Sequence, residues 1–241
     1  MRLADPSQRL VLFDIDGTLI HKGGMGSAAM NRAFHLRHGV DEALHGIRLD
    51  GRTDWSICRE VFAAHSLNWS DEAWRAITDA YVACLEVEAI ERPCGQLCPG
   101  VVPLLERIAS NPNFVVGLLT GNVRRGAEVK LRTFGIWDHF RLGAYGCERE
   151  RREELVEVAR LRAEENLGLR FSSRQIVIIG DTPADIAAAK HGGCVSLAVA
   201  TGRYHTGELL EQGADVALED LSNLERVLEI LSLEFEASAA T

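Results

Sequence analysis

No long apolar run occurs in this sequence, and proline is sparse. No window approaches the roughly 18 consecutive apolar residues that a membrane-spanning helix requires. The opening residues, MRLADPSQRL, also lack the apolar stretch of a signal peptide, so we expect a cytoplasmic protein. Only 6 of the 241 residues are proline, while 46% are hydrophobic and 25% are charged, which excludes disordered, collagen-like and low-complexity chains.

Positive charge is also scarce. The chain has 26 lysine and arginine residues against 35 acidic ones, a formal net charge of −9, and its only lysines are Lys22, Lys130 and Lys190. This balance argues against a protein that coats nucleic acid or an anionic membrane, so we expect neither as a partner. A small anionic substrate remains compatible with it, because one metal ion or a few fixed donors can reverse the local field. The composition favours neither a monomer nor a homodimer.

The six cysteines are scattered rather than clustered. The one close pair, Cys94 and Cys98, has three residues between its members, and no second pair or neighbouring histidines complete a zinc-binding set. We therefore expect all six to be reduced and to serve mostly as small buried apolar groups.

Short apolar runs alternate with helical patterns along most of the chain. The strand-like runs are Leu10–Phe13, Phe114–Leu119, Ile176–Ile179 and Val195–Val199, with weaker candidates at Phe140–Ala144 and Ala214–Leu218. The helical patterns between and after them are Val101–Ala109, Val123–Phe134, Glu150–Asn166, Pro183–His191, Thr206–Gln212 and Leu221–Leu233. Such alternation predicts an α/β fold, a Rossmann-like parallel sheet with helices on both faces.

One region breaks the alternation. About a hundred residues between the first two strand-like runs contain no convincing strand, and a connection of this length predicts an inserted helical domain. Its helical patterns are Gly26–Arg37, Thr53–His65 and Asp71–Glu91. Glycine-rich and proline-rich segments, 21–26 and 92–100, flank it as suitable hinges. We expect a core domain of residues 1–20 and 97–241 and a helical domain of residues 21–96.

Polar residues follow three of the strand-like runs. These segments are Asp14-Ile15-Asp16-Gly17-Thr18, Thr120-Gly121-Asn122 and Asp181-Thr182-Pro183-Ala184-Asp185. Ligands of open α/β sheets bind beyond the carboxyl ends of the strands, so four carboxylates and a threonine are expected at one rim. Gathered carboxylates repel one another and lose hydration, and a bound cation compensates both costs. Each aspartate alone could be a loop residue or a helix cap, but the whole set favours a Mg²⁺ site.

These segments resemble the signature motifs of a known family. Residues 11–19 (VLFDIDGTL) are similar to the first motif of the haloacid dehalogenase-like (HAD) hydrolases, residues 118–122 (LLTGN) to the second, and residues 178–185 (IIGDTPAD) to the fourth. The resemblance covers nearly the whole chain, and the helical insertion occupies the position of the family's C1 cap. It implies a HAD-like core with an inserted cap, in the C1-capped subfamily I and phosphoglycolate phosphatase-like in overall pattern.

The resemblance also implies roles for individual residues. Asp14 becomes the nucleophile that forms an aspartyl phosphate, and Asp16 the acid and base that serves the leaving oxygen and then the attacking water. Alternation in an extended segment places these two side chains on the same side. The implied Mg²⁺ site consists of Asp14, the backbone carbonyl of Asp16, Asp181 and Asp185, the last bonding to the metal's shell. The implied phosphoryl site consists of Thr120 and the N–H of Gly121, with Gly17 and Asn122 beside them.

The third motif departs from the family pattern. The family usually offers a lysine between the second and fourth motifs, but Lys130, in a predicted helix just after the second motif, comes too early for that role. Some relatives have an arginine three residues before a leucine, which points to Arg152, with Arg149 and Arg151 as alternatives. An arginine supplies positive charge and a fork suited to phosphate oxygens. The three arginines could instead form a solvated helix face paired with glutamates.

The cap offers one further candidate. Residues 51–54 (GRTD) lie between two expected cap helices, where a loop could point at the active site. Thr53 is suited to an N-cap, and Arg52 either binds an anionic part of the substrate or is an ordinary surface arginine. The cap tryptophans Trp55, Trp69 and Trp74 are interpreted as cap core rather than as a platform for stacking bases.

Several activities of the family compete. Dehalogenases lack the acid/base aspartate, so Asp16 argues against dehalogenation, and the absence of lysine from Gly26–Glu91 excludes the Schiff-base mechanism of phosphonatases. The resemblance then implies a Mg²⁺-dependent phosphatase for a small organic phosphate monoester, with 2-phosphoglycolate as the nearest named substrate. Two alternatives stay open: a sugar phosphomutase of the same family, and a catalytically silent sensor of a phosphate metabolite.

Overall fold

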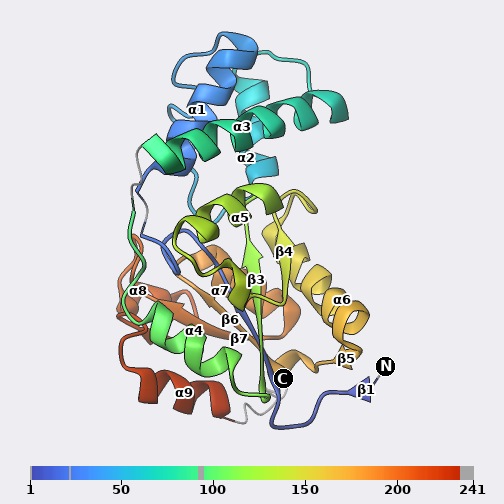
Figure 1. Cartoon of the computed structure of the whole chain (residues 1–241), viewed down its shortest axis with the longest axis vertical. Helices are drawn as coiled ribbons and strands as arrows, with labels where there is room; N and C mark the ends of the chain where they lie inside the picture. Colours follow the sequence, from blue (N-terminus) through green and yellow to red (C-terminus); the bar gives the residue numbers. More distant parts are fainter. Residues whose placement is uncertain (1, 22, 92–94, 234–241) are drawn as a thin grey trace.

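The core of the protein is a parallel sheet. The computed structural model describes residues 2–21, 23–91 and 95–233, so Lys22 and Cys94 lie outside the described residues (Figure 1). The sheet has the strand order β4-β3-β2-β6-β7-β8, and all its neighbouring strands pair in parallel. Its strands are β2 (Arg9–Phe13), β3 (Phe114–Thr120), β4 (Leu142–Tyr145), β6 (Ile176–Gly180), β7 (Val195–Val199) and β8 (Val216–Leu218). The α/β fold expected from the alternating patterns is confirmed.

Helices cover both faces of this sheet because its central strands are apolar on both sides. The helices of the core are α4 (Val101–Ala109), α5 (Arg124–Thr133), α6 (Leu155–Leu167), α7 (Pro183–Gly192), α8 (Thr206–Glu211) and α9 (Leu224–Ser232). In β2, Val11 and Phe13 share one apolar cluster with α4, α5 and α9, whereas Leu10 and Leu12 share another with α6 and α7. Burial on both faces explains why the strands read as continuous apolar runs rather than as alternating ones.

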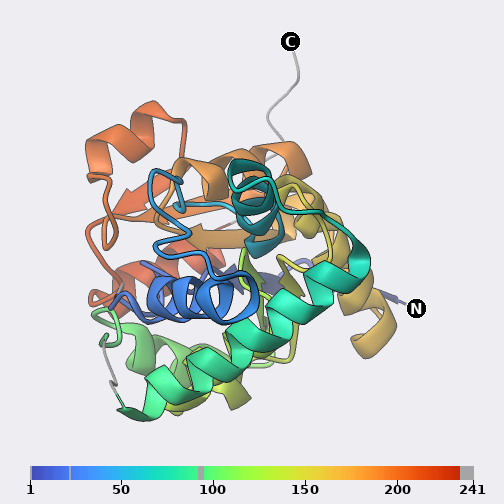
Figure 2. The same cartoon turned by 90° about the horizontal axis from the view of Figure 1, so that it is seen from above.

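Three further helices form a unit above the carboxyl end of the sheet (Figures 1 and 2). They are α1 (Met25–His38), α2 (Asp54–Ala64) and α3 (Asp71–Glu91). They enclose an apolar cluster of their own, against which Trp55, Trp69 and Trp74 pack with their rings tilted relative to one another. The two chain connections to the core run side by side, where His21 N–H donates to the Gln96 carbonyl and Cys98 N–H to that of Leu19, at 2.8 and 3.0 Å. The boundary at residues 20 and 97 stays a prediction.

Several elements differ from the expectation, most of them by one to three residues at an end. The helical pattern from Glu150 predicts one continuous helix, but α6 begins at Leu155 and a 3₁₀ turn, η2 (Arg152–Glu154), precedes it. A small two-stranded sheet of β1 (Arg2–Leu3) and β5 (Leu169–Arg170) was not predicted, because two residues carry no periodicity. Two other short 3₁₀ turns are η1 (Trp137–His139) and η3 (Ser173–Gln175).

No helix in the described ranges is both long and apolar enough to cross a membrane. Of the cysteines in those ranges, Cys58, Cys84, Cys98, Cys147 and Cys194 are all free thiols.

Candidate active site

The central strands deliver the candidate residues to one edge of the sheet. Asp14 directly follows β2, Thr120 is the last residue of β3, and Asp181 directly follows β6. The Asp14 N–H donates to the Ile179 carbonyl at 2.9 Å, which extends the pairing of β2 with β6 to the site itself. Because β2 lies between β3 and β6, the three segments that resemble family motifs meet beyond its carboxyl end.

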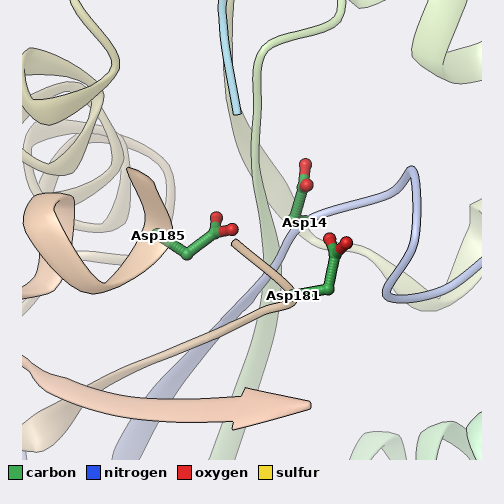
Figure 3. A group of neighbouring side chains, drawn as sticks. All are labelled: Asp14, Asp181 and Asp185. Carbon is green, nitrogen blue, oxygen red and sulfur yellow. The ribbon is translucent and has the colours of Figure 1, made fainter. Parts of the chain in front are cut away.

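Three buried carboxylates gather at this edge (Figure 3). Asp14, Asp181 and Asp185 each offer an oxygen atom within 4.8 Å of the others. Burial raises the pKa of Asp14, the Arg152 guanidinium partly offsets this rise, and Asp185 and Asp16 add to it. The group therefore has an electrostatic need for positive charge.

The donor set fits a magnesium ion. All its side-chain donors are carboxylate oxygens, the hard ligands that Mg²⁺ prefers. Gly17 and Gly202 leave room over Asp181, since a Cβ atom at either position would collide with its Oδ2. Asp185 has one oxygen accepting from Thr182 N–H and Oγ1 at 3.1 and 2.7 Å, and the other accepting from Arg152 at 2.6 Å. Direct ligation is thus best suited to Asp14 and Asp181, with Asp185 adding charge beside them.

Asp185 also starts helix α7. Thr182 and Asp185 form a capping box, in which each side chain accepts from the other's backbone, and Pro183 occupies the first turn. The helix ends at Gly192 and is capped by Gly193, whose φ of 64° is the left-handed conformation that glycine adopts without strain. These local signals place the Asp185 carboxylate beside the strand ends.

Arg152 is the arginine that reaches Asp14. Its Nη2 lies 3.0 Å from Asp14 Oδ1 and 2.6 Å from Asp185 Oδ1, and it donates to the Leu119 carbonyl at 3.2 Å. Burial alone lowers the pKa of Arg152, but the carboxylates of Asp14 and Asp185 outweigh it and raise that pKa above its usual range. The alternatives lie elsewhere: Arg149 donates to the Glu148 carbonyl, and Arg151 pairs loosely with Glu153 at 3.7 Å.

The segment after β3 is tightly constrained. The side-chain nitrogen Nδ2 of Asn122 donates to the Thr120 hydroxyl at 2.9 Å, and the same nitrogen donates to Asp16 Oδ2 at 2.7 Å. A Cβ atom at Gly121 would collide with the carbonyl oxygen of Arg52, so the cap approaches the core backbone directly at this glycine. Gly17 has a φ of 94°, a conformation that favours glycine, and the Thr18 hydroxyl donates to Asp181 Oδ1 at 3.3 Å.

Asp16 turns toward a lysine that the sequence interpretation set aside. Lys130 Nζ lies 2.8 and 2.7 Å from the two carboxylate oxygens of Asp16, and 2.7 Å from Asn122 Oδ1. Lys130 was considered in the sequence only for the third-motif role, and its contact with Asp16 is an addition that the structure makes. One signal could have found it, since Lys130 stands on the buried face of α5 with Gly126, Ala127 and Leu131, and a lysine rarely occupies such a face unpaired.

Helix α2 of the cap docks on the same core loop. Thr53 caps α2 by accepting from Ser56 N–H at 3.1 Å, as expected for this residue. Asp54 N–H donates to the Gly121 carbonyl at 2.7 Å, and Asp54 Oδ2 accepts from Val123 N–H at 2.8 Å. Burial raises the pKa of Asp54 to about 6, against which Lys130 and the Val123 N–H act to lower it. Sequence reasoning missed Asp54, because nothing local marks it as a core contact.

Arg52 lies just before the start of α2, beside the cavity between cap and core. Its guanidinium pairs with Glu60 and donates to the Ser56 carbonyl at 2.9 Å, so it lies along α2. The residue still lines the cavity between cap and core, which has a volume of about 190 Å³. The core side of this cavity carries Asp14, Asp16, Lys130 and Arg152, whereas much of the cap side is apolar, with Met25, Met30, Leu44, Leu49 and Ile57. The role of Arg52 in substrate binding stays a prediction.

Known proteins resemble this chain in sequence and in fold. Residues 8–193 match the family model of the haloacid dehalogenase-like hydrolases. A phosphoglycolate phosphatase of Rhodospirillum rubrum is 27% identical over 221 residues, which cover 90% of this chain and 89% of the relative. The crystal structure of a hydrolase from Pseudomonas syringae superposes with a TM-score of 0.68 at 20% identity, covering 93% of this chain and 99% of that one. CbbY from Rhodobacter sphaeroides, in complex with xylulose-(1,5)bisphosphate, gives the same TM-score at 20% identity, with coverages of 90% and 96%.

The family match covers well over half of the chain, so the protein belongs to the haloacid dehalogenase-like hydrolases. Its relatives are named as phosphatases, so it is an enzyme of the phosphatase type within that family. The family match confirms the resemblance that the three motifs indicated.

Proposed function

We propose that the protein is a Mg²⁺-dependent phosphatase that hydrolyses a small organic phosphate monoester through an aspartyl phosphate on Asp14. The observation that carries this proposal is the buried contact of 3.0 Å between Arg152 and Asp14, beside the carboxylates of Asp181 and Asp185. An arginine fixed against a carboxylate and a compact acidic group together provide positions for the oxygens of a phosphoryl group and for a metal ion.

In the first half-reaction, an Asp14 oxygen attacks phosphorus while the ester oxygen departs with a proton from Asp16. The alcohol leaves, and the phosphoryl group stays on Asp14. In the second half-reaction, Asp16 takes a proton from water, whose oxygen attacks phosphorus and releases inorganic phosphate and the free Asp14 carboxylate. The sum is ester plus water giving alcohol plus phosphate.

Other residues of the site hold the transferred group. Arg152 and the Gly121 N–H donate to its oxygens, with the Thr120 hydroxyl beside them, which stabilises the charge that spreads over them in the transition state. Asp14, the Asp16 carbonyl and Asp181 would hold Mg²⁺, with the Asp185 carboxylate adding negative charge beside them, and the ion supplies further neutralisation of the phosphoryl charge when bound. The docked cap excludes bulk water from the transfer.

The substrate is proposed to be small. A cavity of about 190 Å³ suits a short organic phosphate, and the name of the Rhodospirillum relative makes 2-phosphoglycolate one candidate. Free cysteines across the described residues support a cytoplasmic setting for the enzyme.

The test is hydrolysis of a panel of phosphate esters, including p-nitrophenyl phosphate, 2-phosphoglycolate and hexose phosphates, with and without EDTA. We expect Mg²⁺-dependent release of phosphate that EDTA and Asp14→Asn abolish. Absence of activity across the panel would overturn the proposal in favour of a sensor. Transfer of the phosphoryl group to a sugar, with a hexose bisphosphate present, would overturn it in favour of a mutase.

A further inference from the structure

Helix α5 places one ammonium group beside the acid/base position. Lys130 is 5% exposed, and its Nζ makes three hydrogen bonds, two to the oxygens of Asp16 and one to Asn122 Oδ1. An ammonium group has three donors, so these contacts use all of them. The Lys130 ammonium is therefore held at one point rather than sweeping through the cavity.

Asn122 closes this arrangement into a ring. Its amide nitrogen donates to Asp16 Oδ2 at 2.7 Å and to the Thr120 hydroxyl at 2.9 Å, while its amide oxygen accepts from Lys130. Each of Lys130, Asp16 and Asn122 thus contacts the other two. A closed ring of charge-assisted hydrogen bonds restricts the rotamer of the Asp16 side chain, which is itself 37% exposed toward the cavity.

The cap completes the enclosure of the ammonium group. A Cβ atom built on Gly26, in the first turn of α1, would lie 3.1 Å from Lys130 Nζ and 3.6 Å from the Tyr81 hydroxyl of α3. The absence of a side chain at Gly26 therefore leaves the space that the lysine head occupies. Cap and core both shape the position of Lys130.

We infer that Lys130 is a positioning residue that holds the Asp16 carboxylate in place for its proton transfers. This inference rests on the proposed function, since it concerns the residue that serves the leaving oxygen and the water. General acid catalysis requires the acid within hydrogen-bonding reach of the departing oxygen, and a freely rotating Asp16 satisfies that geometry only part of the time. A purely structural ion pair would instead support the fold without favouring one chemical step.

The dependence on leaving group distinguishes these two roles. An alkyl phosphate needs a proton on its departing oxygen, whereas p-nitrophenolate leaves readily without one. The ratio kcat/KM reports steps only up to departure of the leaving group, so hydrolysis of the aspartyl phosphate does not enter it. For Lys130→Met we expect kcat/KM to fall on the order of 10²-fold with 2-phosphoglycolate or another alkyl phosphate that the wild type hydrolyses. With p-nitrophenyl phosphate we expect only a few-fold loss.

Lys190→Met is the matched control. Lys190, on α7, is also a helical lysine, and its Nζ donates a hydrogen bond to the Gln212 carbonyl at 2.7 Å. It is not among the residues that line the cavity. We expect both substrates to retain wild-type kcat/KM in that variant.

A second variant keeps every charge in place. Gly26→Ala introduces the Cβ atom that presses on Lys130 Nζ, at a helical position where alanine is favoured over glycine. We expect a several-fold loss of kcat/KM confined to the alkyl phosphate. This variant decides the question if Lys130→Met fails to fold, as judged by its thermal transition.

If kcat/KM falls equally with the two substrates in Lys130→Met and Gly26→Ala, or falls with neither, the inference about Lys130 is overturned. That result is distinguishable from failure of the proposed function, because wild-type hydrolysis abolished by Asp14→Asn is measured separately.

Discussion

The Arg152 guanidinium lies 3.0 Å from the carboxylate of Asp14, and both side chains are buried. The arginine comes from the 3₁₀ turn before α6, and the aspartate from the end of β2. The same nitrogen of Arg152 also meets Asp185 at 2.6 Å, so one cation is shared by two carboxylates of the acidic group. A planar guanidinium can hold this geometry while its other donors remain available for phosphoryl oxygens.

Replacement of Arg152 by methionine is expected to lower kcat with p-nitrophenyl phosphate by roughly 10²–10³-fold, the scale for losing one fixed donor to a developing anion. Lysine at this position should restore only part of the loss, because an ammonium group cannot form the same fork. The measurement is steady-state kinetics with saturating Mg²⁺. Arg149→Met, at an exposed neighbouring arginine, serves as the control and should remain near wild type. Full activity of Arg152→Met would contradict the role given to Arg152.

Magnesium is expected to stabilise the folded protein. An ion that binds the folded state alone adds about 2.7 kcal/mol at a hundredfold excess over its Kd, which raises Tm. Asp181→Asn should remove this Mg²⁺-dependent rise in Tm. Titration calorimetry should show a weaker affinity of this variant for Mg²⁺ than of the wild type. Asp138→Asn, at an exposed aspartate, should keep the rise. Equal Mg²⁺ effects on the two variants would show that the ion binds elsewhere.

The raised pKa of Asp54 predicts a pH-dependent loss of stability. Its pKa is about 6 in the folded protein against 3.8 for the ordinary group, so the folded state binds more protons between those values. The free energy of unfolding therefore falls as pH rises from about 4 to about 6, by at most about 3 kcal/mol at ~1.36 kcal/mol per pKa unit.

Asp54→Asn should remove this contribution, because an amide does not titrate and its oxygen can still accept from Val123 N–H. Urea denaturation at several pH values between 4 and 8 measures the difference between variant and wild type. The variant should gain stability relative to wild type as pH rises. If the difference in the free energy of unfolding between variant and wild type does not change with pH, burial does not raise the pKa of Asp54.

Gly121 is expected to control the docking of the cap. A Cβ atom there would collide with the Arg52 carbonyl oxygen, so Gly121→Ala must push the loop before α2 away from the core. We expect at least about a tenfold loss in kcat/KM, since small displacements of positioned groups cost that much or more. Hydrogen exchange of the Asp54 amide, which donates to the Gly121 carbonyl, should become faster.

Gly207→Ala is the control for that substitution. Gly207 is helical and a Cβ atom there would meet nothing within 4 Å, so activity and exchange should stay at wild-type values. Unchanged exchange at Asp54 in Gly121→Ala would mean that the cap tolerates the added methyl group without moving.

Local patterns in the sequence were sufficient for most of the fold. Strands such as Val195–Val199 and helices such as Val101–Ala109 have the predicted bounds, because continuous apolar runs and helical periodicity are local properties. The start of α6 was predicted too early, since the residues before Leu155 have helical composition but form a 3₁₀ turn that turns Arg152 inward.

The amino-acid sequence alone determined which carboxylates meet, because Asp14 and Asp181 follow strands whose carboxyl ends must share one edge of a parallel sheet. Only the tertiary structure decided what surrounds them. Lys130 reaches Asp16 across 114 positions of the chain, Arg52 pairs with Glu60 while it lines the cavity, and Asp54 bonds to the core loop at Val123. The physical reason is that strand ends are aligned by regular backbone pairing, whereas these side chains are placed by tertiary contacts between elements, within the core for Lys130 and between cap and core for Asp54, which leave no periodic trace in the sequence.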